Sequence, residues 1–211
     1  MSPRVFIRSL VLLVITFAGI LVYLFVFAPR QGTMPSDQLI DLNEDNPYSQ
    51  LFLPDFKLVD RNGVEFDETF LDGKYTVVDF FYTSCPLICP GMSAVMRDIQ
   101  FATEDTDIQL LSISIDPEVD TPEVLKNYAN GFKADPLRWK FARGTPDMTQ
   151  ILLMGVGFDL GNLNIEDGFR MIDHPSSILL VGPDRHVIDL YTFSDPDQIQ
   201  ELIEKARELA G

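Results

Sequence analysis

Residues 76–100 read TVVDFFYTSCPLICPGMSAVMRDIQ and contain both cysteines of the chain, Cys85 and Cys89. The first part, up to Tyr82, is rich in β-branched and aromatic residues and is apolar on both faces, which predicts a buried central strand. The second part has a helical pattern, and we expect a helix from Cys89 to about Phe101. The two sulfurs therefore belong to the corner where a strand gives way to a helix.

The spacing of the two cysteines favours a shared chemistry at this corner. Helical positions four apart lie on one face, so both thiols are expected to point the same way. A helix N-terminus offers partial positive charge and free N–H groups, which lower the pKa of a thiol and favour the thiolate that binds metal or attacks a disulfide. A structural disulfide is one alternative, although so small a loop would stabilise the fold only weakly. Two buried, unreactive thiols are another.

One of the two histidines is a candidate third ligand. His174 precedes SSILLVG, which reads as a buried strand, and in a thioredoxin-like layout the loop before that strand faces the cysteine corner. Two thiolates and one imidazole suit copper, because thiolates select Cu(I) and an added imidazole also tolerates Cu(II). A structural zinc site needs four protein ligands, and only Asp173 is at hand as a fourth. His186 follows a turn and is expected to be a solvated hairpin residue.

Asp79 lies inside the predicted central strand. A carboxylate there is costly unless it is paired or protonated, and burial would raise its pKa. Such a group could accept or give a proton as the second thiol reacts, which would favour thiol–disulfide exchange over simple metal storage. An edge-exposed or capping aspartate is the alternative.

Strands and helices alternate along the rest of the chain. Hairpins are expected at 55–70, where Asn-Gly supplies a tight turn, and at 176–193. Further strands are expected at 108–116 and 140–144, and 155–173 reads as irregular. Three predicted helices begin with a capping residue followed by proline: Thr121, Thr145 and Asp195. This alternation predicts a three-layer α/β domain with a mixed sheet flanked by helices.

The N-terminal region reads as a membrane anchor. The stretch SLVLLVITFAGILVYLFVFA carries no charge, and a helix of about 20 residues spans the roughly 30 Å of a bilayer core. Its bulky end disfavours cleavage, which argues against a signal peptide. Arg4 and Arg8 precede it, which predicts a single-pass bacterial inner-membrane protein with a periplasmic domain. Four segments are expected: a cytoplasmic N-terminus at 1–8, a transmembrane helix at 9–28, a flexible acidic tether at 29–50 and a folded domain at 51–211.

The chain is strongly acidic, with 32 acidic against 16 basic residues and a net charge of −16. It would repel a phosphate backbone, so nucleic acid is not an expected partner. An acidic surface either attracts cations or a basic protein face, or simply keeps the domain soluble.

Three segments resemble a known family. TSCPLICP at 83–90 resembles the T-x-C-P-x-x-C-P signature of the Sco (SenC-like) copper-delivery proteins. SIDPEVDTPEVLKNYA at 114–129 and DHPSSILLVGPD at 173–184 are similar to that family's next motifs, in the same order. The resemblance runs from about Leu51 to the C-terminus, and the single anchor also matches.

The resemblance implies a thioredoxin-like fold that binds one copper ion through Cys85, Cys89 and His174. Pro175 departs from the family, which more often has a small hydroxyl residue there. The implied function is assembly of the dinuclear copper centre of cytochrome c oxidase, with the copper-receiving subunit as partner, so a conventional enzyme activity is not expected. The competing hypothesis is a membrane-anchored thiol–disulfide oxidoreductase that uses the Cys85–Cys89 pair, with Asp79 as proton relay, to reduce a copper site or another extracytoplasmic partner.

Overall fold

The structure is a computed structural model that describes residues 47–158, 164–166, 169–171 and 175–211. The predicted membrane span at 9–28 lies outside these residues, as does almost all of the predicted tether. Within the described part of the chain, no helix combines the length and the apolar character that a bilayer crossing requires.

A seven-stranded mixed sheet forms the centre of the domain, in the order β2-β1-β5-β4-β3-β8-β9. Strands β3, β4 and β5 run parallel, whereas β8 is antiparallel to β3 and β1 is antiparallel to β5. Both predicted hairpins are confirmed as the antiparallel pairs β1–β2 and β8–β9. The strands of this sheet are β1 (Lys57–Asp60), β2 (Glu65–Asp67), β3 (Thr76–Phe81), β4 (Gln109–Ser114), β5 (Trp139–Arg143), β8 (Ser177–Val181) and β9 (Val187–Thr192).

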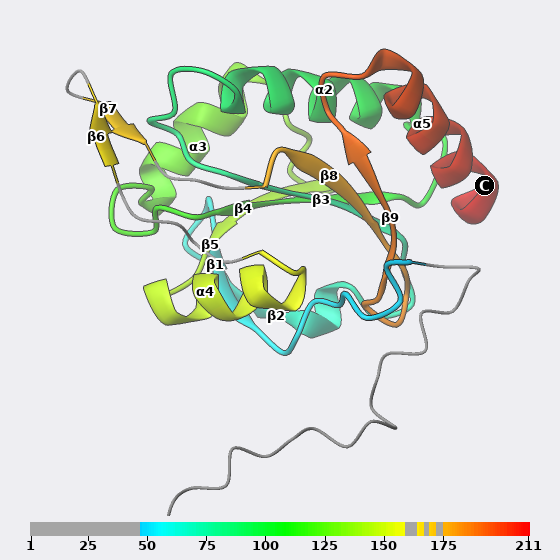
Figure 1. Cartoon of the computed structure of the whole chain (residues 1–211), viewed down its shortest axis with the longest axis horizontal. Coiled ribbons are helices and arrows are strands. Elements are labelled where there is room, and N and C mark those ends of the chain that lie inside the picture. Colours follow the sequence, from blue (N-terminus) through cyan, green and yellow to red (C-terminus); the bar gives the residue numbers. More distant parts are fainter. Residues whose placement is uncertain (1–46, 159–163, 167–168, 172–174) are drawn as a thin grey trace, which may run out of the picture. The chain divides into compact units, whose positions relative to one another are not determined.

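Helices cover both faces of the sheet, which is the predicted thioredoxin-like α/β architecture. Figure 1 shows α2, α3 and α5 on one face and α4 on the other. All three predicted caps are confirmed, because each capping side chain accepts a hydrogen bond from a main-chain N–H in the first turn. The helices are α2 (Cys89–Ala102), α3 (Pro122–Gly131), α4 (Pro146–Gly155), α5 (Pro196–Ala210) and the short 3-10 helix η2 (Glu68–Phe70).

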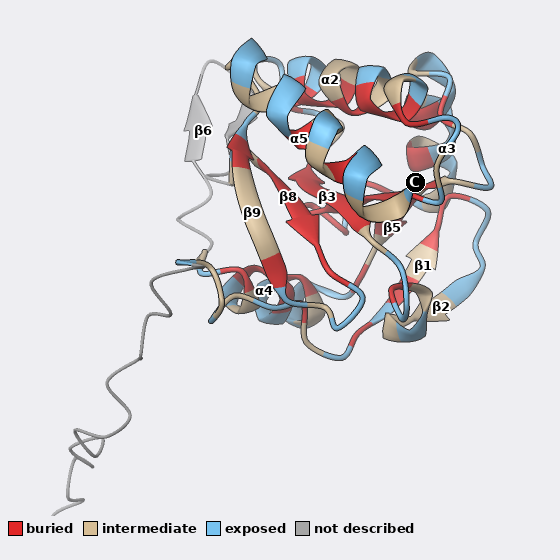
Figure 2. Ribbon diagram, turned by 90° about the vertical axis from the view of Figure 1, so that its right-hand side faces the viewer, coloured by how far each residue is buried: buried red, intermediate tan, exposed pale blue. Residues whose placement is uncertain are grey.

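The core is centred on β3 and β4. Every residue of both strands is buried, as their continuous apolar character predicts. Figure 2 shows this buried layer between α2 and α5 on one side and α4 on the other. The C-terminal end of β3 leads directly out of this core into the cysteine loop, so the loop starts from a rigid base.

The segment predicted to be irregular contains a second, two-stranded sheet. It consists of β6 (Asn164–Glu166) and β7 (Phe169–Met171), which pair antiparallel. The prediction was wrong there because each strand is only three residues long and shows no sustained alternation. The Asp-Gly dipeptide at 167–168 is a hairpin signal in the sequence and could have revealed the pair.

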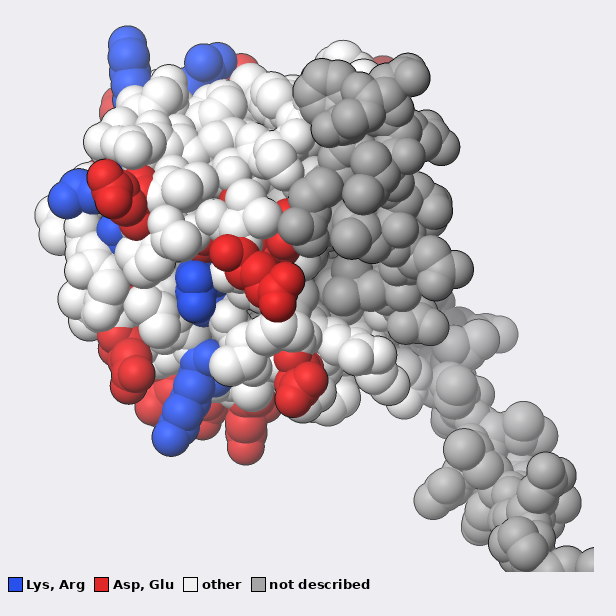
Figure 3. Space-filling view, turned by 90° about the vertical axis from the view of Figure 1, so that its left-hand side faces the viewer, with Lys and Arg blue, Asp and Glu red and all other residues white. Residues whose placement is uncertain are grey.

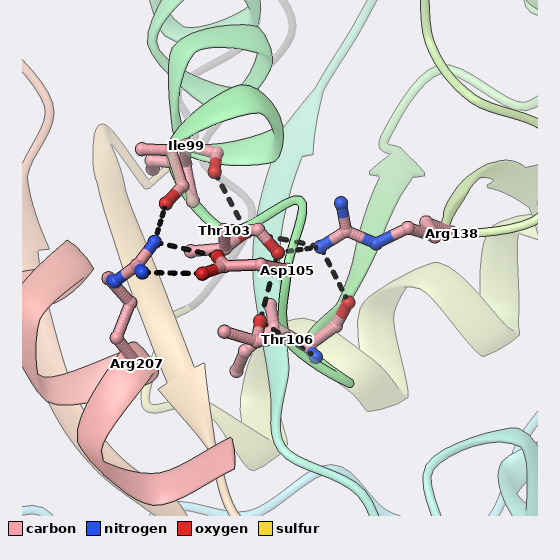
Figure 4. A network of polar contacts seen from close by, with 8 residues as sticks. Ile99, Thr103, Asp105, Thr106, Arg138 and Arg207 are labelled. Atoms are coloured by element: carbon pink, nitrogen blue, oxygen red, sulfur yellow. Dashed lines mark hydrogen bonds and ion pairs between the residues drawn. The ribbon is translucent and has the colours of Figure 1, made fainter. Parts of the chain in front are cut away.

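Two arginines donate hydrogen bonds to carbonyl groups at the C-terminal end of α2, the helix that begins at Cys89 (Figure 4). Arg138 donates to the carbonyl oxygen of Thr103 at 2.6 Å, and Arg207 donates to that of Ala102 at 2.5 Å. Arg207 also pairs with the carboxylate of Asp105. The last carbonyls of a helix lack intrahelical partners, so these contacts satisfy them and fix the helix.

Candidate metal centre

The cysteine loop connects the end of β3 to the start of α2. The main-chain N–H of Cys85 donates to the carbonyl of Tyr82 at 3.3 Å, which closes a turn. Helix α2 then begins at Cys89, as predicted, with a proline in its first turn. Its N-cap residue, Ile88, makes no side-chain cap hydrogen bond, so the first N–H groups of the helix are available to other acceptors.

The sulfur of Cys85 accepts hydrogen bonds from N–H groups at the start of α2 and in the two residues before it. Leu87, Ile88 and Cys89 donate their main-chain N–H groups toward it, and the Cys89 thiol also donates to it. Burial opposes ionisation of Cys85, but the donors together outweigh it and lower the pKa of this thiol. Cys85 is therefore the cysteine that ionises more readily of the two.

Cys89 behaves in the opposite way, although it belongs to the same pair. It is fully buried, and burial together with the neighbouring Cys85 charge raises the pKa of its thiol, only partly offset by the N–H of Tyr82. The two cysteines are reduced thiols in this structure and do not form a disulfide. The structure thus brings the two sulfurs into contact as one thiolate-prone and one protonated group.

Asp79 is buried at the centre of β3 with no exposed surface, so the alternative of an edge or capping aspartate is wrong. Burial raises its pKa to about 7, and a hydrogen bond from Ser112 offsets this only in part. Its charge also contributes to the raised pKa of Cys89. The carboxyl group therefore lies within electrostatic range of the protonated thiol and titrates near neutral pH.

A second buried carboxylate contacts the cysteine loop, and sequence analysis missed it. Asp120 accepts hydrogen bonds from the hydroxyl groups of Thr83 and Ser114 and from the main-chain N–H of Thr83. We call Thr83, Ser114 and Asp120 the Asp120 clamp. Burial raises the pKa of Asp120 in spite of these donors. The only local signal was a threonine two residues before Cys85, which does not reveal its partner.

The predicted third ligand, His174, lies outside the described residues, as does Asp173. The nearest described neighbours in sequence are Pro175 and the start of β8. Because β8 runs antiparallel to β3, with Val78 opposite Leu179, its first residues lie at the end of β3 that leads into the cysteine loop. No group of three or more potential metal ligands is found within the described residues.

His186 is an exposed hairpin residue, as predicted. Its side chain is half exposed, its ring lies 6.0 Å from that of Phe52, and its Nδ1 is 3.3 Å from a carboxylate oxygen of Asp184. A substitution of His186 can therefore serve as the control for a substitution of His174.

The face of the domain at the left of Figure 1, where β3 leads toward α2, is turned to the viewer in Figure 3. Acidic and basic side chains are interspersed on it, with uncharged surface between them (Figure 3). The described part of this face therefore has no single sign of charge.

Comparison with known proteins identifies the family. The family model for SCO1/SenC matches residues 44–211. The SCO1 protein homolog of Bacillus subtilis is 29% identical over 150 residues, which cover 70% of this chain and 77% of the homolog. The structure of Bradyrhizobium japonicum ScoI with copper bound superposes with a TM-score of 0.64 at 26% identity, covering 74% of this chain and 99% of that one.

A further solved structure is that of BsSco, a member of the Sco family of cytochrome c oxidase assembly proteins. It is described as the identification of a disulfide switch in that protein. It has a TM-score of 0.63 at 28% identity and covers 76% of this chain and 95% of that chain. Fold, motif order and family match agree over nearly all of the described domain. The chain belongs to the SCO1/SenC family.

Proposed function

We propose that this chain is a copper chaperone that binds one copper ion through Cys85, Cys89 and His174 and assists assembly of the dinuclear copper centre of cytochrome c oxidase. The observation that carries the proposal is the contact between two reduced thiols at a helix N-terminus, one of which favours the thiolate. Soft sulfur donors of this kind fit Cu(I), and a copper-bound relative with the same fold supports the choice of metal.

The two sulfurs would act in sequence. The Cys85 thiolate is the first donor, since its N–H partners already stabilise the charged form. Cys89 must lose its proton before it can bind, so copper uptake releases a proton and weakens at low pH. Asp79, which titrates at about 7 in electrostatic range of Cys89, is our candidate for the group that receives this proton. His174 would complete a three-coordinate site from which a partner can take the ion by exchanging one ligand at a time.

Copper titration of the full chain in mild detergent tests this function. We expect the reduced chain to bind one Cu(I) ion and the oxidised chain to bind far more weakly. Cys85→Ser, Cys89→Ser and His174→Ala should each weaken binding by orders of magnitude, whereas His186→Ala should not, because that ring is an exposed hairpin residue. An unchanged affinity in His174→Ala would refute the proposed ligand set.

A thiol–disulfide oxidoreductase is the second candidate, favoured by the unequal thiols and by the disulfide switch described for BsSco. The Cys85 thiolate would attack a partner disulfide and release one partner thiolate. Cys89 would then lose its proton and attack the Cys85 sulfur, which releases the second thiolate. The partner gains two electrons and the chain keeps a Cys85–Cys89 disulfide. If Asp79→Asn leaves the rate of exchange with a model disulfide unchanged, Asp79 has no part in this proton transfer.

We also propose that residues 9–28 anchor the chain in the bacterial inner membrane with the domain in the periplasm. If residues 29–50 form the flexible tether that the sequence predicts, some twenty residues would give an r.m.s. reach of about 25 Å, enough to meet a membrane-embedded recipient. Reporter fusions at the C-terminus test the orientation: alkaline phosphatase should be active and a fluorescent protein that folds only in the cytoplasm should be dark. The reverse pattern would contradict it.

A further inference from the structure

The Asp120 clamp joins the start of the cysteine loop to a distant part of the chain. Asp120 Oδ2 accepts the main-chain N–H of Thr83 at 3.2 Å, and its Oδ1 accepts the Thr83 hydroxyl at 2.5 Å. The hydroxyl of Ser114, the last residue of β4, donates to Oδ2 at 2.5 Å. Asp120 has no exposed surface. Three donors therefore converge on one buried carboxylate.

A buried carboxylate is a costly way to obtain stability alone. Its transfer from water is penalised, and well-packed apolar residues often stabilise a fold at least as well as buried charges do. Its advantage is directional, since hydrogen bonds to a charged acceptor are short and fix the positions of the donors. The group that Asp120 fixes on the loop is Thr83, which it holds through both main chain and side chain.

The position of Cys85 depends on Thr83, because both residues belong to the same turn. The hydrogen bond from Cys85 N to Tyr82 O makes Thr83 and Ser84 the inner residues of the turn. Fixing Thr83 therefore sets where the Cys85 sulfur meets the N–H groups at the start of α2. Cys89 is held by α2, and Arg138 donates a hydrogen bond at the opposite, C-terminal end of this helix. The Cys85 sulfur is thus positioned from two sides, through Thr83 and by the N–H groups at the start of α2, whereas Cys89 is held by α2 itself.

We propose that Asp120 is a positioning residue for the metal site, which through Thr83 holds the Cys85 sulfur at the place where both thiols can bind one ion. The copper part of this inference rests on the proposed function. Partners that orient a ligand are needed for full affinity, and their loss commonly costs about 10–100-fold in metal binding. The Asp120 clamp should also have an effect without metal, because the position of Cys85 sets the effective concentration of one thiol at the other.

The test compares Asp120→Asn, Thr83→Val and Thr83→Ser in the full chain. Asp120→Asn removes the charge, and Thr83→Val removes the hydroxyl at nearly constant shape. We expect both to lower Cu(I) affinity by about 10–100-fold. In the metal-free chain, both should lower the equilibrium constant for disulfide formation against glutathione by about threefold or more, as the effective concentration of the thiols falls. Thr83→Ser keeps both donors and should restore wild-type values.

Thr103→Ala is the matched control for stability. Thr103 is fully buried just beyond the other end of α2 and donates its hydroxyl to Ile99 O at 2.8 Å. Its loss should lower the denaturation midpoint and leave both sulfur measurements unchanged. The proposal is overturned if the Asp120 and Thr83→Val variants lose stability in the same way but keep the wild-type copper affinity and disulfide equilibrium.

Copper binding by the chain and the positioning role of Asp120 are tested by separate measurements. If wild-type chain binds no Cu(I), the proposed function fails, and the disulfide equilibrium of the metal-free variants still decides whether Asp120 positions Cys85. If Asp120→Asn does not fold, the comparison of Thr83→Val with Thr83→Ser decides it, because these two differ in the hydroxyl that Asp120 holds.

Discussion

Asp79 and Ser112 lie opposite each other on the parallel strands β3 and β4, and the serine hydroxyl donates to Asp79 Oδ1 at 2.5 Å. The same hydroxyl accepts the indole N–H of Trp139 at 2.9 Å. The other oxygen of Asp79, Oδ2, is buried without a hydrogen-bond partner among the described residues. One hydroxyl cannot offset the desolvation of a charged carboxylate, which explains why the pKa of Asp79 is raised to about 7.

This raised pKa predicts a pH-dependent gain in stability for Asp79→Asn. An unfolded aspartate has a pKa of about 3.9, so between about pH 4 and 7 the folded chain holds a proton that the unfolded chain releases. The free energy of unfolding of the wild type therefore falls as pH rises through this window. Asparagine does not ionise, and we expect the variant to gain up to about 4 kcal/mol relative to wild type across the window. Urea denaturation at several pH values measures it.

Asp67→Asn is the control of opposite sign. Hydrogen bonds from the side chain and main chain of Thr69 lower the pKa of Asp67, so its ionised form favours folding. That stability is present at neutral pH and is lost as pH falls through the lowered pKa. Asp67→Asn should therefore lose stability relative to wild type as pH rises from the acid range. A constant difference between wild type and Asp79→Asn over the whole window would contradict the account of Asp79.

The unequal thiols predict selective alkylation. The pKa of Cys85 is lowered by N–H donors, whereas burial raises that of Cys89. Iodoacetamide reacts with thiolate, so at pH 7 we expect Cys85 to be modified at least about tenfold faster than Cys89. Peptide mapping by mass spectrometry measures both rates. In Cys85→Ser the remaining thiol should stay unmodified, and in Cys89→Ser the remaining thiol should react; equal rates in the wild type would argue against the assignment.

The elements that sequence predicted correctly are those with local signals. Capping residues followed by proline mark three helix starts because capping involves only neighbouring residues. The buried strands β3 and β4 follow from their continuous apolar runs. The pair β6–β7 was missed because three residues per strand give no measurable period, although the Asp-Gly dipeptide at 167–168 is a hairpin signal in the sequence.

The candidate site was predictable only where its chemistry is local. Cys85 and Cys89 share one loop, so their spacing and the helix start at Cys89 predicted that both thiols point the same way. Asp120 was not predictable, because it is 37 residues from Thr83 and only the sheet brings them together. His174 lies outside the described residues, and its role as a ligand stays a prediction.

The hydrogen bonds that Arg138 donates at the C-terminal end of α2 are expected to stabilise the fold without affecting the metal site. Arg138 donates to the carbonyl oxygens of Gln100, Thr103 and Ile108. Hydrogen bonds from a charged donor contribute about 1.5–3 kcal/mol, and we expect Arg138→Met to lower the free energy of unfolding by that order without changing Cu(I) affinity. Arg207→Met is the matched control: its side chain is 44% exposed, so its ion pair should contribute less than about 1 kcal/mol. Equal losses in both variants would contradict the ranking.

Alanine substitutions at two helix-terminal glycines are expected to change the free energy of unfolding in opposite directions. A Cβ at Gly155, the last residue of α4, would lie 2.5 Å from the carbonyl oxygen of Phe52 and 2.7 Å from Pro54 Cδ. The main-chain N–H of Phe52 also donates to Gly155 O at 3.0 Å, so the two backbones cannot separate without losing this bond. We expect Gly155→Ala to cost about 1–3 kcal/mol in the free energy of unfolding.

Gly131, the last residue of α3, is the matched site where the same substitution meets no atom within 4 Å. Alanine there restricts the unfolded chain and adds helix propensity, so Gly131→Ala should raise stability by about 0.5–1 kcal/mol. Chemical denaturation of both variants gives the comparison. Because Phe52 belongs to the first described segment of the domain, Gly155→Ala should also expose this segment to proteolysis before the core unfolds. If Gly155→Ala were as stable as Gly131→Ala, the close approach of Phe52 to α4 would not exist in solution.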